Sequence, residues 1–217
     1  MIVAVLGEKG GTGKTTLATN LAGMRATDGR DVLIIDADRQ GSASYWAEKR
    51  SDKHRDLSAV QSVQKFGEGL MRTVRDLERR YDDILIDAGA GDSREVESSL
   101  RVADLAIIPV QPAGLDVWTL GLIDDRVSEA LTVNEALCAY VVLNRASPNP
   151  KDHDAEEARQ AIEGCTHLQL APGVICDRVV VKRAAPAGLT VLEYKPLDAK
   201  AVAEMQQLYA LAFAPRR

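Results

Sequence analysis

A segment near the start of the chain combines glycines with lysines and threonines. It consists of Lys9, Gly10, Gly11, Thr12, Gly13, Lys14, Thr15 and Thr16. Glycines permit backbone conformations in which successive N–H groups curl around one anion, and a lysine supplies the opposite charge. A threonine hydroxyl directly after the lysine can ligate Mg²⁺, while the helix that follows points its positive N-terminus at the anion. The pattern therefore predicts a site for nucleotide phosphates with Mg²⁺.

This segment departs from the strict P-loop consensus, which places a glycine five residues before Gly13. Glu8 occupies that position, and Gly7 lies one residue too early. A glycine-rich turn without a ligand is the alternative interpretation. Gly-Lys-Thr between an expected strand and an expected helix instead favours a phosphate loop of a variant type.

Carboxylates follow two later apolar runs. Asp36 and Asp38 come after residues 32–35, and Asp87 follows residues 84–86. Carboxylate oxygens can bind Mg²⁺, directly or through water, and can orient an attacking water. The alternative for Asp36 and Asp38 is an acidic turn that caps the next helix. The order of these residues after the glycine loop favours the chemical interpretation.

Short β-branched runs alternate with helical patterns along the chain. The expected strands are residues 2–6, 32–35, 84–86, 105–110 and 140–143, with a weaker candidate at residues 179–181. The expected helices are residues 15–26, residues 66–80, and a last helix after Asp198 with an apolar stripe at Val202, Met205, Leu208, Tyr209 and Ala212. This alternation predicts an α/β fold in which a mainly parallel β-sheet is flanked by helices on both faces. We expect residues 1–217 to form a single domain, with its ligand at the carboxyl ends of the strands.

The composition argues against several classes of protein. A formal net charge of −5 does not suit a chain that coats nucleic acid with its whole surface, although it is compatible with a local basic face. No apolar run approaches the roughly 20 residues of a membrane span, and the first residues lack the basic start of a signal peptide. The three cysteines lack CxxC spacing and suggest neither a zinc site nor a disulfide framework. A reducing cytoplasm fits best.

The segment from Lys9 to Thr15 resembles the deviant Walker A signature of the ParA/MinD family, in which an additional lysine begins the loop. The stretch Asp36-Ala37-Asp38-Arg39-Gln40 is similar to the family's second acidic motif, with Arg39 in place of the usual proline. Asp87 and the small residues after it resemble a Walker B acid and a second switch region. The resemblance extends from Met1 to about Phe213, and it implies a P-loop NTPase fold.

The same resemblance implies an ATPase that hydrolyses the phosphoanhydride bond of ATP with Mg²⁺. Lys9, Lys14 and Asp36 would be catalytic, and Lys9 would reach across an ATP-sandwich homodimer to the ATP of the partner subunit. The nucleotide would be bound by Gly10, Gly11, Thr12, Gly13, Lys14, Thr15, Thr16, Asp38, Pro112 and Asn144. Mg²⁺ would be held by Thr15, Asp36 and Asp87. The Asn144 amide donates and accepts in one plane, which suits the adenine edge; for Pro112, ordinary loop punctuation is the alternative.

Within the family, the chain is most similar to the short partition ATPases, since no helix-turn-helix segment precedes the loop. This similarity implies non-specific DNA binding, a ParB-like centromere-binding partner that stimulates hydrolysis, and segregation or positioning of plasmid or chromosome cargo. It also implies a cytoplasmic protein that associates with the nucleoid when ATP is bound.

The last part of the sequence contains more basic than acidic residues, which could form a DNA-binding face. The basic residues are Arg178, Lys182, Arg183, Lys195, Lys200, Arg216 and Arg217, against Glu193, Asp198 and Glu204. The alternative is a solvated surface that binds nothing.

Two other functions are compatible with the same loop. One is a MinD-like membrane-positioning ATPase, but the ending Ala214-Pro215-Arg216-Arg217 is a poor membrane anchor, so we expect no membrane partner. The other is a metabolic ATP-dependent amide-forming enzyme, of the dethiobiotin or cobyrinate type, in which phosphate transfer activates a carboxylate.

Overall fold

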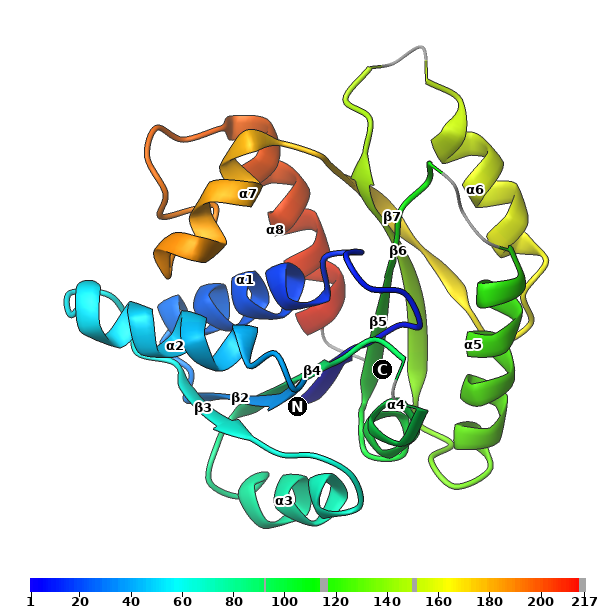
Figure 1. Cartoon of the computed structure of the whole chain (residues 1–217), viewed down its shortest axis with the longest axis horizontal. Coiled ribbons are helices and arrows are strands. Elements are labelled where there is room, and N and C mark those ends of the chain that lie inside the picture. Colours follow the sequence, from blue (N-terminus) through cyan, green and yellow to red (C-terminus); the bar gives the residue numbers. More distant parts are fainter. Residues whose placement is uncertain (92, 114–116, 150–151, 215–217) are drawn as a thin grey trace.

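A parallel β-sheet forms the centre of the molecule in the computed structural model, which describes residues 1–91, 93–113, 117–149 and 152–214. Seven strands lie in the order β3-β2-β4-β1-β5-β6-β7, and each pairs with its neighbours in parallel (Figure 1). They are β1 (Ile2–Val5), β2 (Val32–Ala37), β3 (Gln61–Gln64), β4 (Asp83–Ala88), β5 (Leu105–Val110), β6 (Cys138–Ala146) and β7 (Gln169–Cys176). The expected α/β fold is confirmed.

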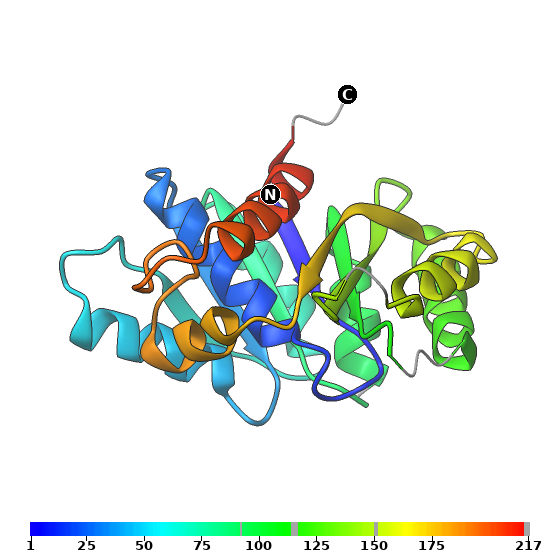
Figure 2. The same cartoon turned by 90° about the horizontal axis from the view of Figure 1, so that it is seen from above.

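Helices cover both faces of this sheet (Figures 1 and 2). One face carries α1 (Lys14–Thr27), α2 (Ser42–Lys53), α7 (Val179–Ala184), the short 3-10 helix η1 (Ala185–Ala187) and α8 (Ala199–Phe213). The other face carries α3 (Gly69–Leu77), α4 (Ser93–Leu100), α5 (Val117–Leu131) and α6 (Asp154–Glu163). Within the described ranges, no helix combines the length and the apolar character that a membrane-spanning helix requires.

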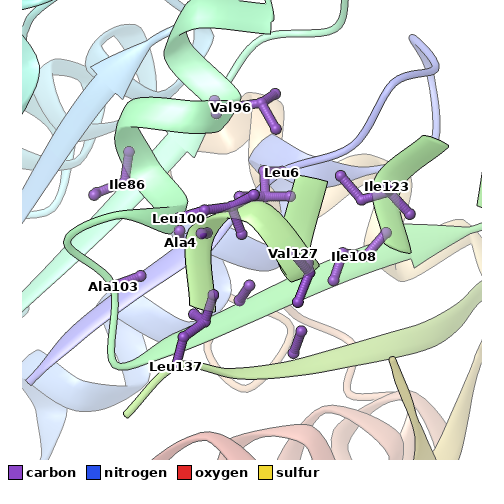
Figure 3. Close-up of a cluster of buried hydrophobic side chains, with 14 of the residues drawn as sticks. Ala4, Leu6, Ile86, Val96, Leu100, Ala103, Ile108, Ile123, Val127 and Leu137 are labelled. Carbon is purple, nitrogen blue, oxygen red and sulfur yellow. The ribbon is translucent and has the colours of Figure 1, made fainter. Parts of the chain in front are cut away.

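Alternate side chains of the strands enter two hydrophobic cores, one on each face. Leu6 and Ile86 pack with Leu100 of α4 in the core beneath α3 to α6 (Figure 3). Val5 and Leu85, one residue away from them, belong to the core beneath α1, α2 and α8. Because both faces are covered, the central strands are mostly apolar and their register is strongly specified, whereas the edge strand β3 is polar.

The order of the strands determines where a ligand can bind. β1 lies between β4 and β5, so the chain leaves β1 toward β2 and β3 on one side, while β5, β6 and β7 extend on the other. A crevice forms at the carboxyl ends of strands where such connections diverge. The glycine loop directly follows β1 and therefore lies at this point.

Most of the expected elements are present, with different bounds. The five stronger strand predictions correspond to β1, β2, β4, β5 and β6, and residues 15–26 to α1. The helix expected over residues 66–80 is confirmed only as α3 (Gly69–Leu77), whose Leu70 and Val74 are buried. In the last helix, Asp198 is the N-cap as expected, because its carboxylate accepts from the N–H groups of Lys200 and Ala201.

The weak strand prediction at residues 179–181 was wrong. These residues begin α7, in which Val180 and Ala184 are buried on one side, four residues apart. Packing of this face against the helices of the second core overrides the β-propensity of three consecutive valines. The sheet instead ends in β7, which the sequence pattern missed because Pro172 and Gly173 interrupt it. A proline is tolerated there because β7 is an edge strand with an irregular register to β6.

Candidate functional site

The glycine loop connects the end of β1 to the first turn of α1. Gly11 and Gly13 have φ angles of 76° and 97°, in the left-handed region that favours glycine. A Cβ atom on Gly13 would clash with Nδ2 of Asn144. Backbone conformation and space therefore both require glycine at position 13.

Side chains from the ends of β5 and β6 hold the loop in place. Asn144 Nδ2 donates to the Thr12 carbonyl at 2.6 Å, and Arg145 Nη1 donates to the Gly11 carbonyl at 2.7 Å. Gln111 Nε2 donates to the same Gly11 carbonyl at 3.0 Å. These bonds use carbonyl oxygens of the loop and none of its N–H groups, an arrangement that suits a loop whose N–H groups bind an anion.

The two lysines of the loop have different environments. Lys14 is buried, with 6% of its surface exposed, and its Nζ donates to the Lys9 carbonyl at 2.8 Å. Burial lowers the pKa of Lys14, against the opposing effect of Asp87, Asp38 and Glu8. Lys9 is exposed at the outer end of the loop. Lys14 can therefore neutralise an anion inside the site, whereas Lys9 faces outward.

Asp36 and Asp87 lie side by side at the ends of β2 and β4. They are aligned partners in these neighbouring strands, so their side chains leave the sheet on the same face, and both are buried. Asp36 accepts hydrogen bonds from the N–H groups of Asp38 at 3.2 Å and Ser44 at 2.7 Å. Both carboxylate oxygens of Asp87, by contrast, are buried and accept no hydrogen bond from any described residue.

This environment changes the acidity of Asp87. Burial raises the pKa of Asp87 from 3.8 to about 7, and the negative charges of Asp36 and Asp38 act in the same direction. The Thr15 hydroxyl and the positive charge of Lys14 lower it in part. A buried carboxylate without donors is costly unless a cation accompanies it. Mg²⁺ bound to nucleotide phosphates fits this position, because a hard cation prefers oxygen ligands.

A cavity of about 420 Å³ opens beside the loop. The predicted residues that line it are Gly10, Gly11, Gly13, Lys14, Thr15, Thr16, Asp38 and Asn144. Asp36 and Asp87 lie buried at its strand ends, and the Thr12 hydroxyl is buried without a hydrogen-bond partner in the described part of the chain. Pro112 is buried and borders a neighbouring cavity lined also by Arg145 and Asp177. The structure thus gathers the loop, the carboxylates and Asn144, and leaves Pro112 at the margin.

Part of the cavity wall comes from residues that the sequence did not single out for this site. Cys176 and Asp177 at the end of β7 line it together with Val181 and Lys182 of α7. Lys182 Nζ donates to Asp177 at 2.7 Å. In the sequence, the only signal for these residues is that they follow a strand, and the pattern of residues 169–176 does not predict that strand.

Two of the described basic residues in the last segment are paired with carboxylates. Arg178 pairs with Glu204 at 2.6 Å, and Lys182 pairs with Asp177 as described above. Arg183, Lys195 and Lys200 are exposed, and Arg183 and Lys200 border the same groove. Arg216 and Arg217 lie outside the described residues. The face available to a nucleic acid is therefore narrower than the sequence suggested.

Comparisons with known proteins agree with this geometry. A family model described as "CobQ/CobB/MinD/ParA nucleotide binding domain" matches residues 3–191. Maintenance of carboxysome distribution protein A of Gloeobacter kilaueensis is 32% identical over 200 residues, which cover 92% of this chain and 87% of that protein. Protein ParA of Rhizobium radiobacter is 26% identical over 155 residues, covering 70% of this chain and 68% of that protein. An ATP complex of a Cyanothece McdA variant has a TM-score of 0.76 at 17% identity, covering 100% of this chain and 97% of that chain, which is a likeness of fold.

Proposed function

Because this chain belongs to the CobQ/CobB/MinD/ParA family of nucleotide-binding domains, and is a P-loop ATPase that uses ATP and Mg²⁺, we propose that it is a partition ATPase that positions cargo on DNA. In the proposed cycle, ATP joins two copies into a sandwich homodimer, and the dimer binds nucleoid DNA non-specifically. A ParB-like partner attached to the cargo then stimulates hydrolysis and releases the dimer. The observation that carries the proposal is the outward-facing Lys9 on a loop whose Lys14 is buried.

The residues have separate proposed roles in this cycle. The loop N–H groups and Lys14 bind the β- and γ-phosphates, and Asn144 contacts the adenine, with Pro112 beside it. Thr15 and Asp87 hold Mg²⁺, which neutralises charge on the transferred phosphate when bound. Asp36 keeps lone pairs beyond its two backbone hydrogen bonds, and these orient the attacking water.

The segments after β2 and β4, which we propose respond to the γ-phosphate, are in close contact. A Cβ atom on Gly89, in the segment after Asp87, would lie 3.1 Å from the Asp38 carboxylate carbon. A side chain at position 89 would therefore displace Asp38. We propose that this close approach makes the segments after β2 and β4 rearrange together when the γ-phosphate leaves.

Lys9→Ala is expected to bind ATP but to remain monomeric, because its ammonium stabilises charge on the nucleotide of the partner subunit. Size-exclusion chromatography with a non-hydrolysable ATP analogue and Mg²⁺ measures this directly. Lys53→Ala, which removes an exposed lysine at the end of α2, should dimerise as the wild type does. A dimer of Lys9→Ala would contradict the role of Lys9, and a monomeric wild type would contradict the sandwich.

Arg183→Glu is expected to weaken ATP-dependent DNA retention on the order of tenfold and to reduce its salt dependence, because an exposed arginine on α7 contacts phosphates. Filter binding over a salt series measures both effects. Arg72→Glu reverses an exposed arginine on α3, which covers the opposite face of the sheet. Equal losses in both variants would indicate a general charge effect and would contradict the assignment to α7.

The experiment that tests the function as a whole is stimulation of ATP turnover. We expect DNA together with the cognate centromere-binding protein to increase turnover, and the similarity to a carboxysome-distribution protein supports a large body as an alternative cargo. Stimulation by a small carboxylic acid would instead favour an amide-forming enzyme. Sedimentation with liposomes and ATP would favour a membrane-positioning ATPase.

A further inference from the structure

A short segment after α7 contacts both helices that begin at the nucleotide site. This anchor segment, residues 187–193, continues from α7 through η1, and its start is tied back by hydrogen bonds from Gly188 N–H to Ala185 and from Leu189 N–H to Ala184. α7 carries the exposed Arg183. The anchor segment is therefore hydrogen-bonded to the end of α7, which we call the basic helix. Figures 1 and 2 place α7 beside α1 and α2, away from α5 and α6.

Helix α2 is attached to the anchor segment along one side. Trp46 Nε1 donates to the Leu189 carbonyl at 3.3 Å, and His54 Nε2 lies 2.9 Å from the Ala187 carbonyl. Between them, Arg50 is fully buried and forms a two-pronged pair with Glu193, with N···O distances of 2.8 and 2.6 Å. Trp46, Arg50 and His54 are four residues apart and so lie on one face of the helix. Planar pairing of this kind fixes orientation as well as distance.

The approach of the two backbones is unusually close at Gly188. Its φ is 77°, and a Cβ atom there would lie 2.9 Å from the backbone nitrogen of Arg50. Glu193 also accepts from the Thr190 N–H at 2.8 Å, so one carboxylate holds both Arg50 and the anchor segment itself. Close backbone packing and these hydrogen bonds therefore hold α2 in a fixed position relative to the anchor segment.

The other end of α2 reaches the nucleotide site. The N–H of Ser44 in its first turn donates to the Asp36 carboxylate at 2.7 Å. Helix α1 is attached as well, because Asn20 accepts from the Val191 N–H at 2.8 Å and donates to the carbonyl of Thr16 at 2.8 Å. Both the phosphate loop and the Asp36 segment thus have a hydrogen-bonded route to the same few residues.

We infer that Arg50 and Glu193 are positioning residues that couple the nucleotide site to the basic helix α7. When the segment after β2 rearranges around the nucleotide, α2 moves as a rigid body, and the Arg50–Glu193 pair passes that movement to the anchor segment. Because coupling between two sites is reciprocal, a ligand bound by α7 also changes the position of the Asp36 segment. The DNA-binding consequence rests on the proposed function, whereas the coupling itself does not.

The test is hydrogen exchange of the full chain, with and without a non-hydrolysable ATP analogue and Mg²⁺. Because Val181 and Lys182 line the cavity themselves, the readout is residues 183–193. In the wild type we expect the nucleotide to slow exchange there as well as in the glycine loop. Glu193→Gln should lose the slowing at residues 183–193 and keep it in the loop. Arg50→Lys retains the charge without the planar fork, and should lose part of the effect.

Glu204→Gln is the matched control. Glu204 also pairs with an arginine through both oxygens, and it also accepts from a backbone N–H, that of Cys176. Its pair joins the start of α7 to α8 and involves neither α1 nor α2. We expect Glu204→Gln to keep the nucleotide effect at residues 183–193.

Three results would overturn the inference: no nucleotide effect at residues 183–193 in the wild type, an undiminished effect there in Glu193→Gln, or an equal loss in Glu204→Gln. DNA retention by the same proteins forms a separate arm. There, the increase in DNA affinity on adding the nucleotide should fall on the order of tenfold in Glu193→Gln. A wild type that shows the exchange pattern without retaining DNA would refute the proposed function and leave the coupling established.

Discussion

Asp87→Asn is expected to make the nucleotide-free protein more stable above pH 7 and at the same time to lower ATP turnover about 100-fold or more. Asp87 is buried without a hydrogen-bond donor among the described residues. In the absence of a cation, a neutral amide of the same shape avoids the cost of a buried charge. In the presence of Mg²⁺ and ATP, the amide lacks the charge that holds the metal.

The effect on stability depends on pH with a defined sign. The pKa of Asp87 is raised from 3.8 to about 7 in the folded protein, so the folded state binds the proton more tightly than the unfolded state. This stabilising contribution is fully present below about pH 4, and it is lost as the pH rises to about 7. The free energy of unfolding of Asp87→Asn should therefore exceed that of the wild type by roughly 3 to 5 kcal/mol above pH 7, and by little near pH 4. Denaturant titrations at both pH values measure the difference.

Asp83→Asn is the control on the same strand. Asp83 is equally buried, but it pairs with Arg25 at 2.6 Å. Removing one partner of a buried pair leaves an uncompensated charge, so this substitution should destabilise the protein. Equal destabilisation by both substitutions would contradict the environment inferred for Asp87. Binding of Mg²⁺ should also become tighter as the pH rises through about 7, because the ligand must lose its proton.

Asp36→Ala is expected to bind ATP, to hydrolyse it about 100-fold more slowly and to accumulate as a dimer. The carboxylate is proposed to orient the attacking water, and its loss should leave the phosphate loop and Asp87 in place. Single-turnover hydrolysis and size-exclusion chromatography in the presence of ATP measure the two effects. Normal turnover would contradict the catalytic role of Asp36.

Asp36→Ala also affects the stability of the protein, so a second variant is compared with it. Alanine also leaves the buried N–H groups of Asp38 and Ser44 without their acceptor, which costs stability. The two N–H groups bond to different oxygens of Asp36, so Asp36→Asn keeps an acceptor for one of them and loses the other. It is expected to be slow with a smaller loss of stability than Asp36→Ala. Asp31→Ala removes an exposed carboxylate just before the same strand and should leave turnover unchanged.

Several features of this protein were determined by local sequence alone. The glycine loop was recognisable because a phosphate site of this kind is built from consecutive residues. The structure agrees, since Gly13 has a φ of 97°, in the region that favours glycine. The apolar runs predicted the five central strands because a strand buried on both faces must be apolar throughout. Asp36 and Asp87 followed from their places at the ends of those strands.

Other features depend on contacts between distant segments. Both donors to Asp36 are local, the N–H groups of Asp38 and of Ser44 in the first turn of α2, as in the helix-capping alternative considered for this residue. The sequence does not indicate, however, that Asp87 is buried and accepts no hydrogen bond from the described residues. Burial is contributed by the neighbouring strands, so only the folded chain determines the environment of Asp87.

The wrong strand prediction at residues 179–181 has the same physical reason, which is packing between distant segments. Three valines at residues 179–181 favour a strand by propensity, but tertiary packing places them in α7, and the edge strand is the less regular β7. The pairing of Arg50 with Glu193 joins residues 143 positions apart. Spacing along the chain determines local motifs such as the glycine loop, whereas long-range packing decides which polar groups are buried, which are paired and which remain for a ligand.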